Sequence, residues 1–263
     1  MPEVSASPFL RPCVLITSNK MQKQTVLLII IAALLGLITG FLLANFLNRS
    51  EVGMLRPVAE GSTAQSTPGA ADQNLSPEEI KAKIAEADAN SGDFSFQKNL
   101  GLGLYRYAAM KQDDMLLEEA RRILDRARSI NASDFDVLVG LGNAQFDIGF
   151  YRKDAASFQA ARDTYSRALT IRPDDADVQT DLGLTYFLQD PPAYDKAEQE
   201  LKKVGNKNPR HERSLQFLVQ VYTRQNRPSD ARSTLEKLKS LNPAHPAIAE
   251  LSTMVAAVEK GAG

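Results

Sequence analysis

His211 and His245 are the only two histidines of this 263-residue chain, and they are the first candidates for a chemical centre. Each lies between two predicted helices, at the last position of a repeated unit described below. Two imidazoles could share a metal ion or act as an acid–base pair, but a catalytic metal site takes a third protein ligand and keeps an open position. The alternative is that both are turn residues that precede a helix, and the sequence favours this alternative.

The motifs of common enzymes and cofactor proteins are missing from the sequence. The single cysteine, Cys13, excludes a disulfide framework and a multi-cysteine metal site. There is no C-x-x-C-H motif for covalent haem, no P-loop, no G-x-G-x-x-G and no H-E-x-x-H. A formal net charge of −1 gives no electrostatic argument for nucleic acid. We therefore predict a protein that is not an enzyme, holds no cofactor or metal, and binds no nucleic acid.

A Leu-Gly pair followed by aromatic residues recurs at a fixed spacing along the chain. It stands in NLGLGLYRYA (99–108), GLGNAQFDIG (140–149) and DLGLTYFLQD (181–190). A small residue at the glycine position lets two helices approach closely, and a late proline ends the second helix of the unit. One such hairpin cannot bury its own apolar face, so the hairpins must stack.

The unit at 212–245 shows the plan in its shortest form. Apolar residues recur from Leu215 on one helix face, a break follows at 226–228, a second apolar series begins at Ala231, and Pro243 ends it. The same plan gives repeats at about 94–134, 135–175, 176–211 and 212–245, with capping helices at 77–90 and 246–260. We predict an all-α protein, a superhelical solenoid of helix-turn-helix hairpins over 76–260.

These units resemble the tetratricopeptide repeat (TPR), most clearly in DLGLTY at 181–186 with Ala197 and Pro209. The first two units are each seven residues longer than the family's pattern, at 109–115 and 150–156. The family's tryptophan position also differs here: it is occupied by Gln97, Leu138, Gln179 and Leu215. The resemblance implies a TPR-like scaffold that binds a protein or peptide in a groove lined by the first helix of each hairpin.

The alignment places fourteen residues on this groove. They are Lys98, Leu102, Tyr105, Arg106, Val139, Asn143, Phe146, Asp147, Thr180, Leu184, Phe187, Gln216, Gln220 and Arg224. We expect Tyr105, Phe146 and Phe187 to be exposed anchors for a ligand. The alternative for Phe146 and Phe187 is packing between neighbouring repeats.

One subclass of the family grips the C-terminal carboxylate of chaperones, and only part of its pattern is present. Lys98 and Asn143 match two positions of that grip. Thr180 and Leu184 stand where the family has Lys and Arg, which argues against this specificity.

Residues 25–47 form an uncharged, apolar segment after a short N-terminal segment, 1–24. Its 23 residues would measure roughly 34 Å as a helix, enough to cross a bilayer core. The segment is longer than the apolar region of a signal peptide, the alternative interpretation. Residues 48–75 are rich in small and polar residues and predict a flexible linker. The linker ends at a capping box that begins with Ser76.

Arg11, Lys20 and Lys23 precede the predicted span, whereas Arg49 and Arg56 follow it. This bias favours a cytoplasmic N-terminus, with the repeat domain on the periplasmic or extracytoplasmic side of a bacterial inner membrane. Within the span, Gly36 and Gly40 form a G-x-x-x-G pair that could pack two copies into a homodimer.

We therefore predict a single-pass, membrane-anchored scaffold that mediates protein–protein interaction in a bacterial envelope assembly process. The order of anchor, linker and repeat domain with over-long repeats is similar to that of the TPR subunits of bacterial cytochrome c haem-lyase systems. That likeness implies a factor that presents apocytochrome to the haem lyase. A dimeric structural spacer is the other alternative, and the sequence does not name the partner.

Overall fold

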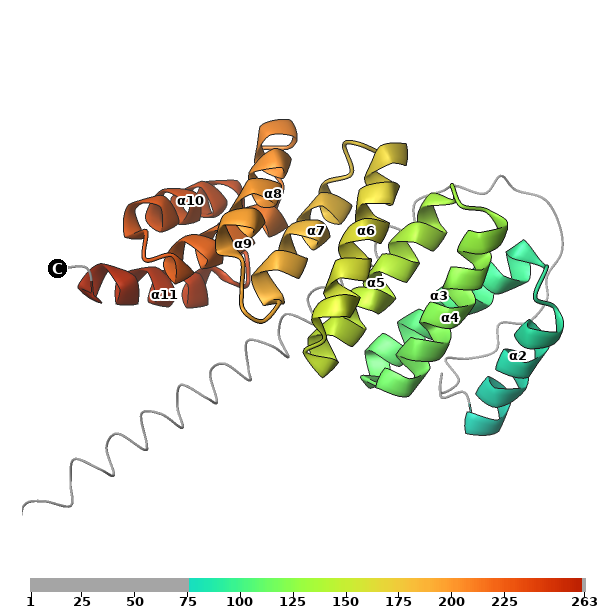
Figure 1. Ribbon diagram of the computed structural model, residues 1–263. Coiled ribbons are helices and arrows are strands. Elements are labelled where there is room, and N and C mark those ends of the chain that lie inside the picture. Colours follow the sequence, from blue (N-terminus) through green and yellow to red (C-terminus); the bar gives the residue numbers. More distant parts are fainter. Residues whose placement is uncertain (1–75, 262–263) are drawn as a thin grey trace, which may run out of the picture. The chain divides into compact units, whose positions relative to one another are not determined.

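The computed structural model describes residues 76–261 of the chain (Figure 1). The predicted membrane span and linker, with Gly36 and Gly40, lie outside the described residues. Within the described range the secondary structure is entirely helical, and it contains no helix both long and apolar enough to cross a membrane. The prediction of an all-α solenoid is confirmed.

Within residues 76–261, ten helices follow one another along the stack. They are α2 (Pro77–Ala89), α3 (Phe94–Lys111), α4 (Asp114–Ile130), α5 (Phe135–Arg152), α6 (Ala155–Ile171), α7 (Ala176–Leu188), α8 (Tyr194–Lys207), α9 (Glu212–Arg224), α10 (Pro228–Leu241) and α11 (Ile248–Gly261). The pairs α3–α4, α5–α6, α7–α8 and α9–α10 form four hairpins, and α2 and α11 flank them (Figure 1). The first helices of successive hairpins contact one another, and α11 contacts α9. These helices therefore share one layer of the stack.

Three glycines allow the two helices of a hairpin to approach closely. A Cβ added to Gly101 would lie 2.8 Å from Leu124 Cγ, and one added to Gly142 would lie 2.6 Å from Tyr165 Cε1. At Gly183 the nearest atom, Leu201 Cγ, would lie 3.1 Å away. Since real Cβ contacts are rarely this short, the predicted role of the glycine position is confirmed in these hairpins. In the fourth hairpin Val219 fills the equivalent position and is buried.

The extra residues of the first two units lengthen the paired helices. Helices α3 and α5 have 18 residues, whereas α7 and α9 have 13. The long hairpins turn in the same way, because Gln112 and Lys153 both adopt left-handed backbone with φ 54°. The next residue in each turn, Asp113 or Asp154, caps the second helix by accepting two backbone N–H bonds.

Helix α2 covers the first hairpin. Its N-terminus has the predicted capping box, in which Ser76 accepts from the Glu79 N–H and the Glu79 carboxylate accepts from the Ser76 N–H. At the other end, the buried amide of Gln97 donates to the Ala87 carbonyl at 2.7 Å. This bond gives a reason for a polar residue at the tryptophan position of the first unit: it satisfies a carbonyl at the C-terminus of α2.

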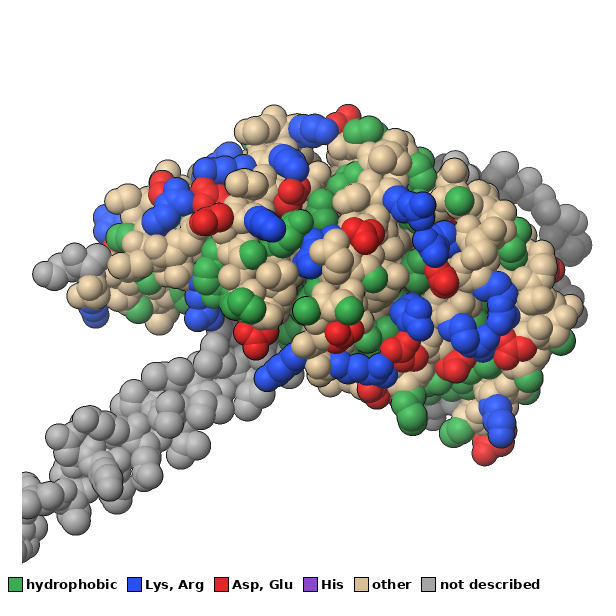
Figure 2. All heavy atoms as spheres, in the orientation of Figure 1, with side chains coloured by type: hydrophobic (Ala, Val, Ile, Leu, Met, Phe, Trp, Pro, Cys, Tyr) green, Lys and Arg blue, Asp and Glu red, His purple; other side chains and the backbone are tan. Residues whose placement is uncertain are grey.

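The molecular surface carries many ion pairs between neighbouring elements, and Figure 2 shows basic and acidic side chains interspersed over one face. Arg122 and Arg126 of α4 both bind Asp88 at the end of α2. The hydrogen bonds from these guanidinium groups lower the pKa of Asp88 to about 2. Such exposed pairs orient the capping helix but add little stability each.

Candidate protein-binding groove

The fourteen predicted groove residues lie on α3, α5, α7 and α9, which form the shared layer, but they differ in accessibility. Eight are exposed or half-buried: Lys98, Leu102, Arg106, Val139, Phe187, Gln216, Gln220 and Arg224. Six are buried: Tyr105, Asn143, Phe146, Asp147, Thr180 and Leu184. The prediction that all three aromatic residues are exposed anchors is therefore wrong for Tyr105, which is 7% exposed, and for Phe146, which is 3% exposed.

Tyr105 is buried because it joins two hairpins. Its hydroxyl donates to Asp147 Oδ2 at 3.0 Å, and both residues lie in the buried part of the layer. The two residues are 42 positions apart, one more than the spacing of the Leu-Gly pairs. This near-equivalent spacing is the sequence signal for a contact between successive first helices.

The two phenylalanines have different packing partners. The Phe146 ring meets the Phe158 ring edge-on, with centroids 5.7 Å apart, so Phe146 packs within its own hairpin. The centroid of the Phe187 ring lies 5.7 Å from the ring centroid of Tyr194 in its own hairpin. It lies 6.5 Å from the ring centroid of Phe217 in the next hairpin. The alternative of packing between repeats is therefore confirmed for Phe187, which remains half-buried.

The polar residues that matched the carboxylate grip are engaged within the protein. Lys98 Nζ binds Asp134 at 2.9 Å and Asp136 at 2.8 Å. Burial alone would lower the pKa of Lys98, but these hydrogen bonds outweigh it and raise the pKa. Asn143 Oδ1 accepts from the Tyr165 hydroxyl at 2.8 Å. A ligand carboxylate would have to replace these bonds, so the structure gives no support to that specificity.

On the predicted groove face, half-buried apolar side chains lie on α3, α5 and α7, and exposed arginines lie on α3 and α9. Leu102, Val139 and Phe187 are half-buried. Arg106 of α3 and Arg224 of α9 are exposed, and neither guanidinium forms an ion pair within residues 76–261. We call Leu102, Arg106, Val139, Phe187 and Arg224 the open groove. Apolar contact area with unpaired arginines is a composition found at the centres of protein interfaces.

Each histidine accepts a backbone hydrogen bond at or just before the start of the helix that follows it. Nδ1 of His211 accepts from the Ser214 N–H at 3.2 Å, and Nδ1 of His245 accepts from the Ala247 N–H at 3.2 Å. The interpretation as residues that precede a helix is confirmed. In the part of the chain that the structure describes, no group of three or more His, Cys, Asp or Glu residues could hold a metal ion.

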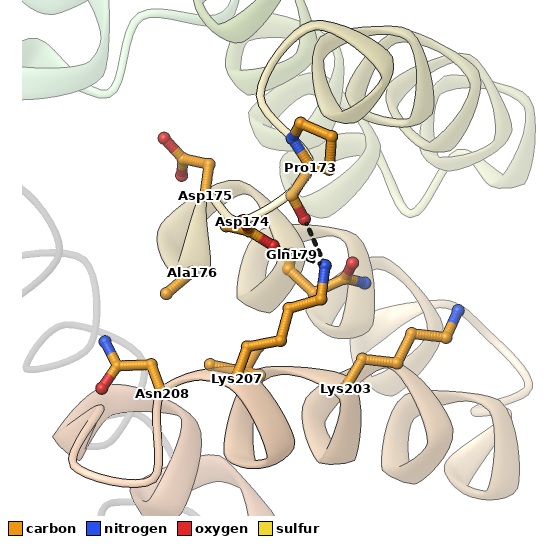
Figure 3. Close-up of a pocket in the computed structure, with 9 residues that line it drawn as sticks. Pro173, Asp174, Asp175, Ala176, Gln179, Lys203, Lys207 and Asn208 are labelled. Carbon is orange, nitrogen blue, oxygen red and sulfur yellow. Dashed lines mark hydrogen bonds and ion pairs between the residues drawn. The ribbon is translucent and has the colours of Figure 1, made fainter.

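A small depression lies where the loop between α6 and α7 meets the end of α8 (Figure 3). Its volume of about 10 Å³ is about the space that one water molecule needs. Lys207 Nζ reaches across it to the Pro173 carbonyl at 2.8 Å, as Figure 3 shows. The remaining lining residues are Asp174, Asp175, Ala176, Gln179, Lys203, Val204 and Asn208. This depression lies between two neighbouring repeats and is too small for an organic substrate.

Comparisons with known proteins agree with this geometry. Residues 193–255 match the family model of the tetratricopeptide repeat. Two crystal structures of MamA are similar at 22% sequence identity, over 63% of this chain and 81% or 87% of theirs, with TM-scores of 0.50 and 0.51. A MamA structure from Desulfovibrio magneticus RS-1 is 16% identical, over 64% of this chain and 86% of that chain, with a TM-score of 0.50. No curated protein sequence matches. At these identities the likeness confirms a TPR-like fold alone.

Proposed function

We propose that this protein is a non-enzymatic scaffold that binds a protein or peptide partner through its open groove. The observation that carries the proposal is a pair of exposed arginines, Arg106 and Arg224, which form no ion pair within residues 76–261. They lie on the same helix layer as half-buried apolar side chains. A guanidinium without an internal partner is available to a ligand carboxylate or carbonyl, and Arg is enriched at binding hot spots.

The proposal includes a membrane anchor at residues 25–47 and a linker at 48–75. The support for the anchor is the length of the uncharged apolar segment. The charge bias around it supports a single pass through a bacterial cytoplasmic membrane, with the repeat domain outside the cytoplasm. A tether of this kind raises the effective concentration of the groove for partners in the same membrane.

Within this scaffold class, service to an envelope assembly process such as cytochrome c maturation is the narrower form of the proposal. It is supported by the order of anchor, linker and over-long repeats. The Gly36–Gly40 spacing favours a second candidate, a dimeric spacer held together in the membrane.

The experiment is a cross-linked pull-down from native membranes, followed by binding measurements with each purified partner. The double variant Arg106→Glu, Arg224→Glu reverses both open-groove charges without removing an ion pair within residues 76–261. We expect it to lose the partner, with affinity falling at least tenfold. The matched control is Arg167→Glu, Lys237→Glu, which changes two exposed cations on the second helices α6 and α10.

Equal binding by the groove variant and the control, with unchanged helical content, would refute the groove. If the partner is lost only on Gly40→Leu, which changes the G-x-x-x-G pair, the spacer is the better account. Haem-lyase subunits or c-type cytochromes among the groove-dependent partners would establish a role in cytochrome c maturation.

A further inference from the structure

A buried arginine lies where the second hairpin, α5–α6, meets the third, α7–α8. Arg162 of α6 is 8% exposed, and its Cζ lies 4.7 Å from the ring centroid of Tyr186 on α7. It forms no ion pair within residues 76–261. Buried charges in proteins are normally paired with an opposite charge, so the missing counter-charge of Arg162 needs an explanation.

The hydrogen bonds of this guanidinium use only part of its capacity. Nη1 donates to Gln189 Oε1 at 3.0 Å, and Nε and Nη2 donate to Gln159 Oε1 at 3.2 Å and 3.0 Å. A guanidinium has five N–H groups, so two have no acceptor in the described part of the chain. Asp163 attracts the charge, but its carboxylate accepts from Gln159 Nε2 at 2.8 Å, and burial lowers the pKa of Arg162.

A second cation lies against the same tyrosine ring. Lys196 of α8 is exposed, and its Nζ lies 5.5 Å from the Tyr186 centroid. Like Arg162, it forms no ion pair among the residues that the structure describes. The helices that carry these three side chains follow one another in the stack (Figure 1). Two cations without a carboxylate partner therefore share one aromatic ring.

The next junction, between the third and fourth hairpins, shows what completes such a cluster. Lys202 Nζ and Arg227 Cζ lie 5.9 Å and 4.5 Å from the ring centroid of Tyr222, which is the equivalent of Tyr186 in the next repeat. Both cations bind the Glu198 carboxylate, at 2.5 Å and 2.6 Å. One carboxylate can thus contact two cations that share a tyrosine ring at such distances.

Two differences between repeats remove an internal carboxylate from the cluster at Tyr186. Arg162 stands where α8 has Glu198, because each directly follows the repeated alanine of the second helix. In the first hairpin the equivalent arginine, Arg121, donates to Glu118 at 2.7 Å. Gln159 stands at the position of that glutamate and offers a neutral amide instead. Both neighbouring repeats therefore supply a carboxylate that this repeat lacks.

We propose that Arg162 and Lys196 form a binding site for a carboxylate that comes from outside the repeat domain and is held beside Tyr186. Guanidinium groups bind carboxylates through charge-assisted hydrogen bonds, for which two N–H groups of Arg162 remain. Both cations lie on second helices, so the site is separate from the open groove and does not rest on its function. The carboxylate belongs to an acidic protein segment or to a small free acid, and the test distinguishes these sources.

The test measures the fluorescence anisotropy of a labelled hexaglutamate peptide with the full-length protein in detergent, at constant ionic strength. We expect saturable binding that unlabelled hexaglutamate reverses. Competition by acetate at the same carboxylate concentration would show that a small free acid suffices. Competition by the peptide alone would assign the site to acidic protein segments. Absence of saturable binding to the wild-type protein would overturn the proposal.

The decisive variant is Gln159→Glu, which places beside Arg162 the carboxylate that the first hairpin has at this position. It should weaken peptide binding about tenfold or more without lowering the urea midpoint, because the internal carboxylate occupies the site. Lys196→Ala should weaken binding about threefold or more, since it removes the exposed cation. The matched control is Ser233→Glu, which adds the same charge at an exposed position of α10 and should bind like wild type.

Three results would contradict the site. Equal binding by Gln159→Glu and wild type would show that the peptide does not use Arg162. Equal weakening by Gln159→Glu and Ser233→Glu would reduce the effect to net charge. Loss of the peptide on Arg106→Glu, Arg224→Glu, with binding kept by Gln159→Glu, would place it in the open groove. Loss of a native partner on the groove variant alone, with peptide binding kept, would leave both sites standing.

Discussion

Substituting Gly142 with alanine tests whether close helix approach holds the hairpins together. A Cβ at this position would lie 2.6 Å from Tyr165 Cε1 and 2.7 Å from Cδ1. Tyr165 is fully buried, and its hydroxyl is bonded to Asn143, so the ring cannot move away without loss. The overpacking should cost about 1–3 kcal/mol, and the weakened hydrogen bond about 1 kcal/mol more.

The opposing effect is the better helix propensity of alanine, which contributes about 1 kcal/mol in the favourable direction. The balance is a destabilisation of about 1–3 kcal/mol for Gly142→Ala. Gly103 is the control, because a Cβ there would meet nothing within 4 Å. Gly103→Ala should therefore stabilise the domain by about 0.5–1 kcal/mol.

The assay is urea unfolding followed by circular dichroism, with the midpoint compared among the variants. A second test is the double variant Gly142→Ala, Tyr165→Leu: if the ring is the obstacle, alanine should cost less in the Tyr165→Leu background than in the wild type. Equal or higher stability of Gly142→Ala relative to wild type would refute the reasoning. So would a cost that is unchanged when the ring is removed.

Two further predictions concern contacts between hairpins. Arg162 is 8% exposed, its Cζ lies 4.7 Å from the Tyr186 ring centroid, and its guanidinium donates to Gln189 Oε1 at 3.0 Å. Because Arg162→Ala removes both contacts, it should lower the free energy of unfolding by about 2 kcal/mol in the same urea assay. Arg162→Leu, which keeps the bulk, should recover only part of this loss; full recovery would contradict a role for the charge. For Glu198, burial raises the pKa but the hydrogen bonds from Lys202 and Arg227 outweigh it, so its folded-state pKa is lowered from 4.5. Its contribution to stability is therefore present above about pH 4.5 and is lost as pH falls through the lower folded-state value. Between pH 5 and pH 3, wild type should lose more stability than Glu198→Gln, and parallel pH profiles would contradict this.

Much of the fold could be predicted because a few residues act through local backbone geometry. Pro228 begins α10, and Pro243 follows the end of that helix, so the boundaries could be predicted from chemistry that needs no tertiary contact. The glycine positions predicted a close approach, and Gly101 and Gly142 show it. The histidines were correctly placed before helices, but the choice of Nδ1 as acceptor depends on side-chain geometry that sequence spacing does not fix.

The groove was harder to predict because equivalent positions of the repeats are not equivalent in their surroundings. Tyr105, Phe146 and Phe187 align at one position, yet the first bonds across hairpins, the second packs on Phe158 and the third contacts Phe217. Phe158 stands in the first turn of α6, directly after the extra residues of the second unit. The short third hairpin has no such extension, since α7 ends at Leu188. A repeat alignment identifies the helix face that a residue occupies, but neighbouring elements decide its exposure, so groove predictions fail first where the unit length departs from the pattern.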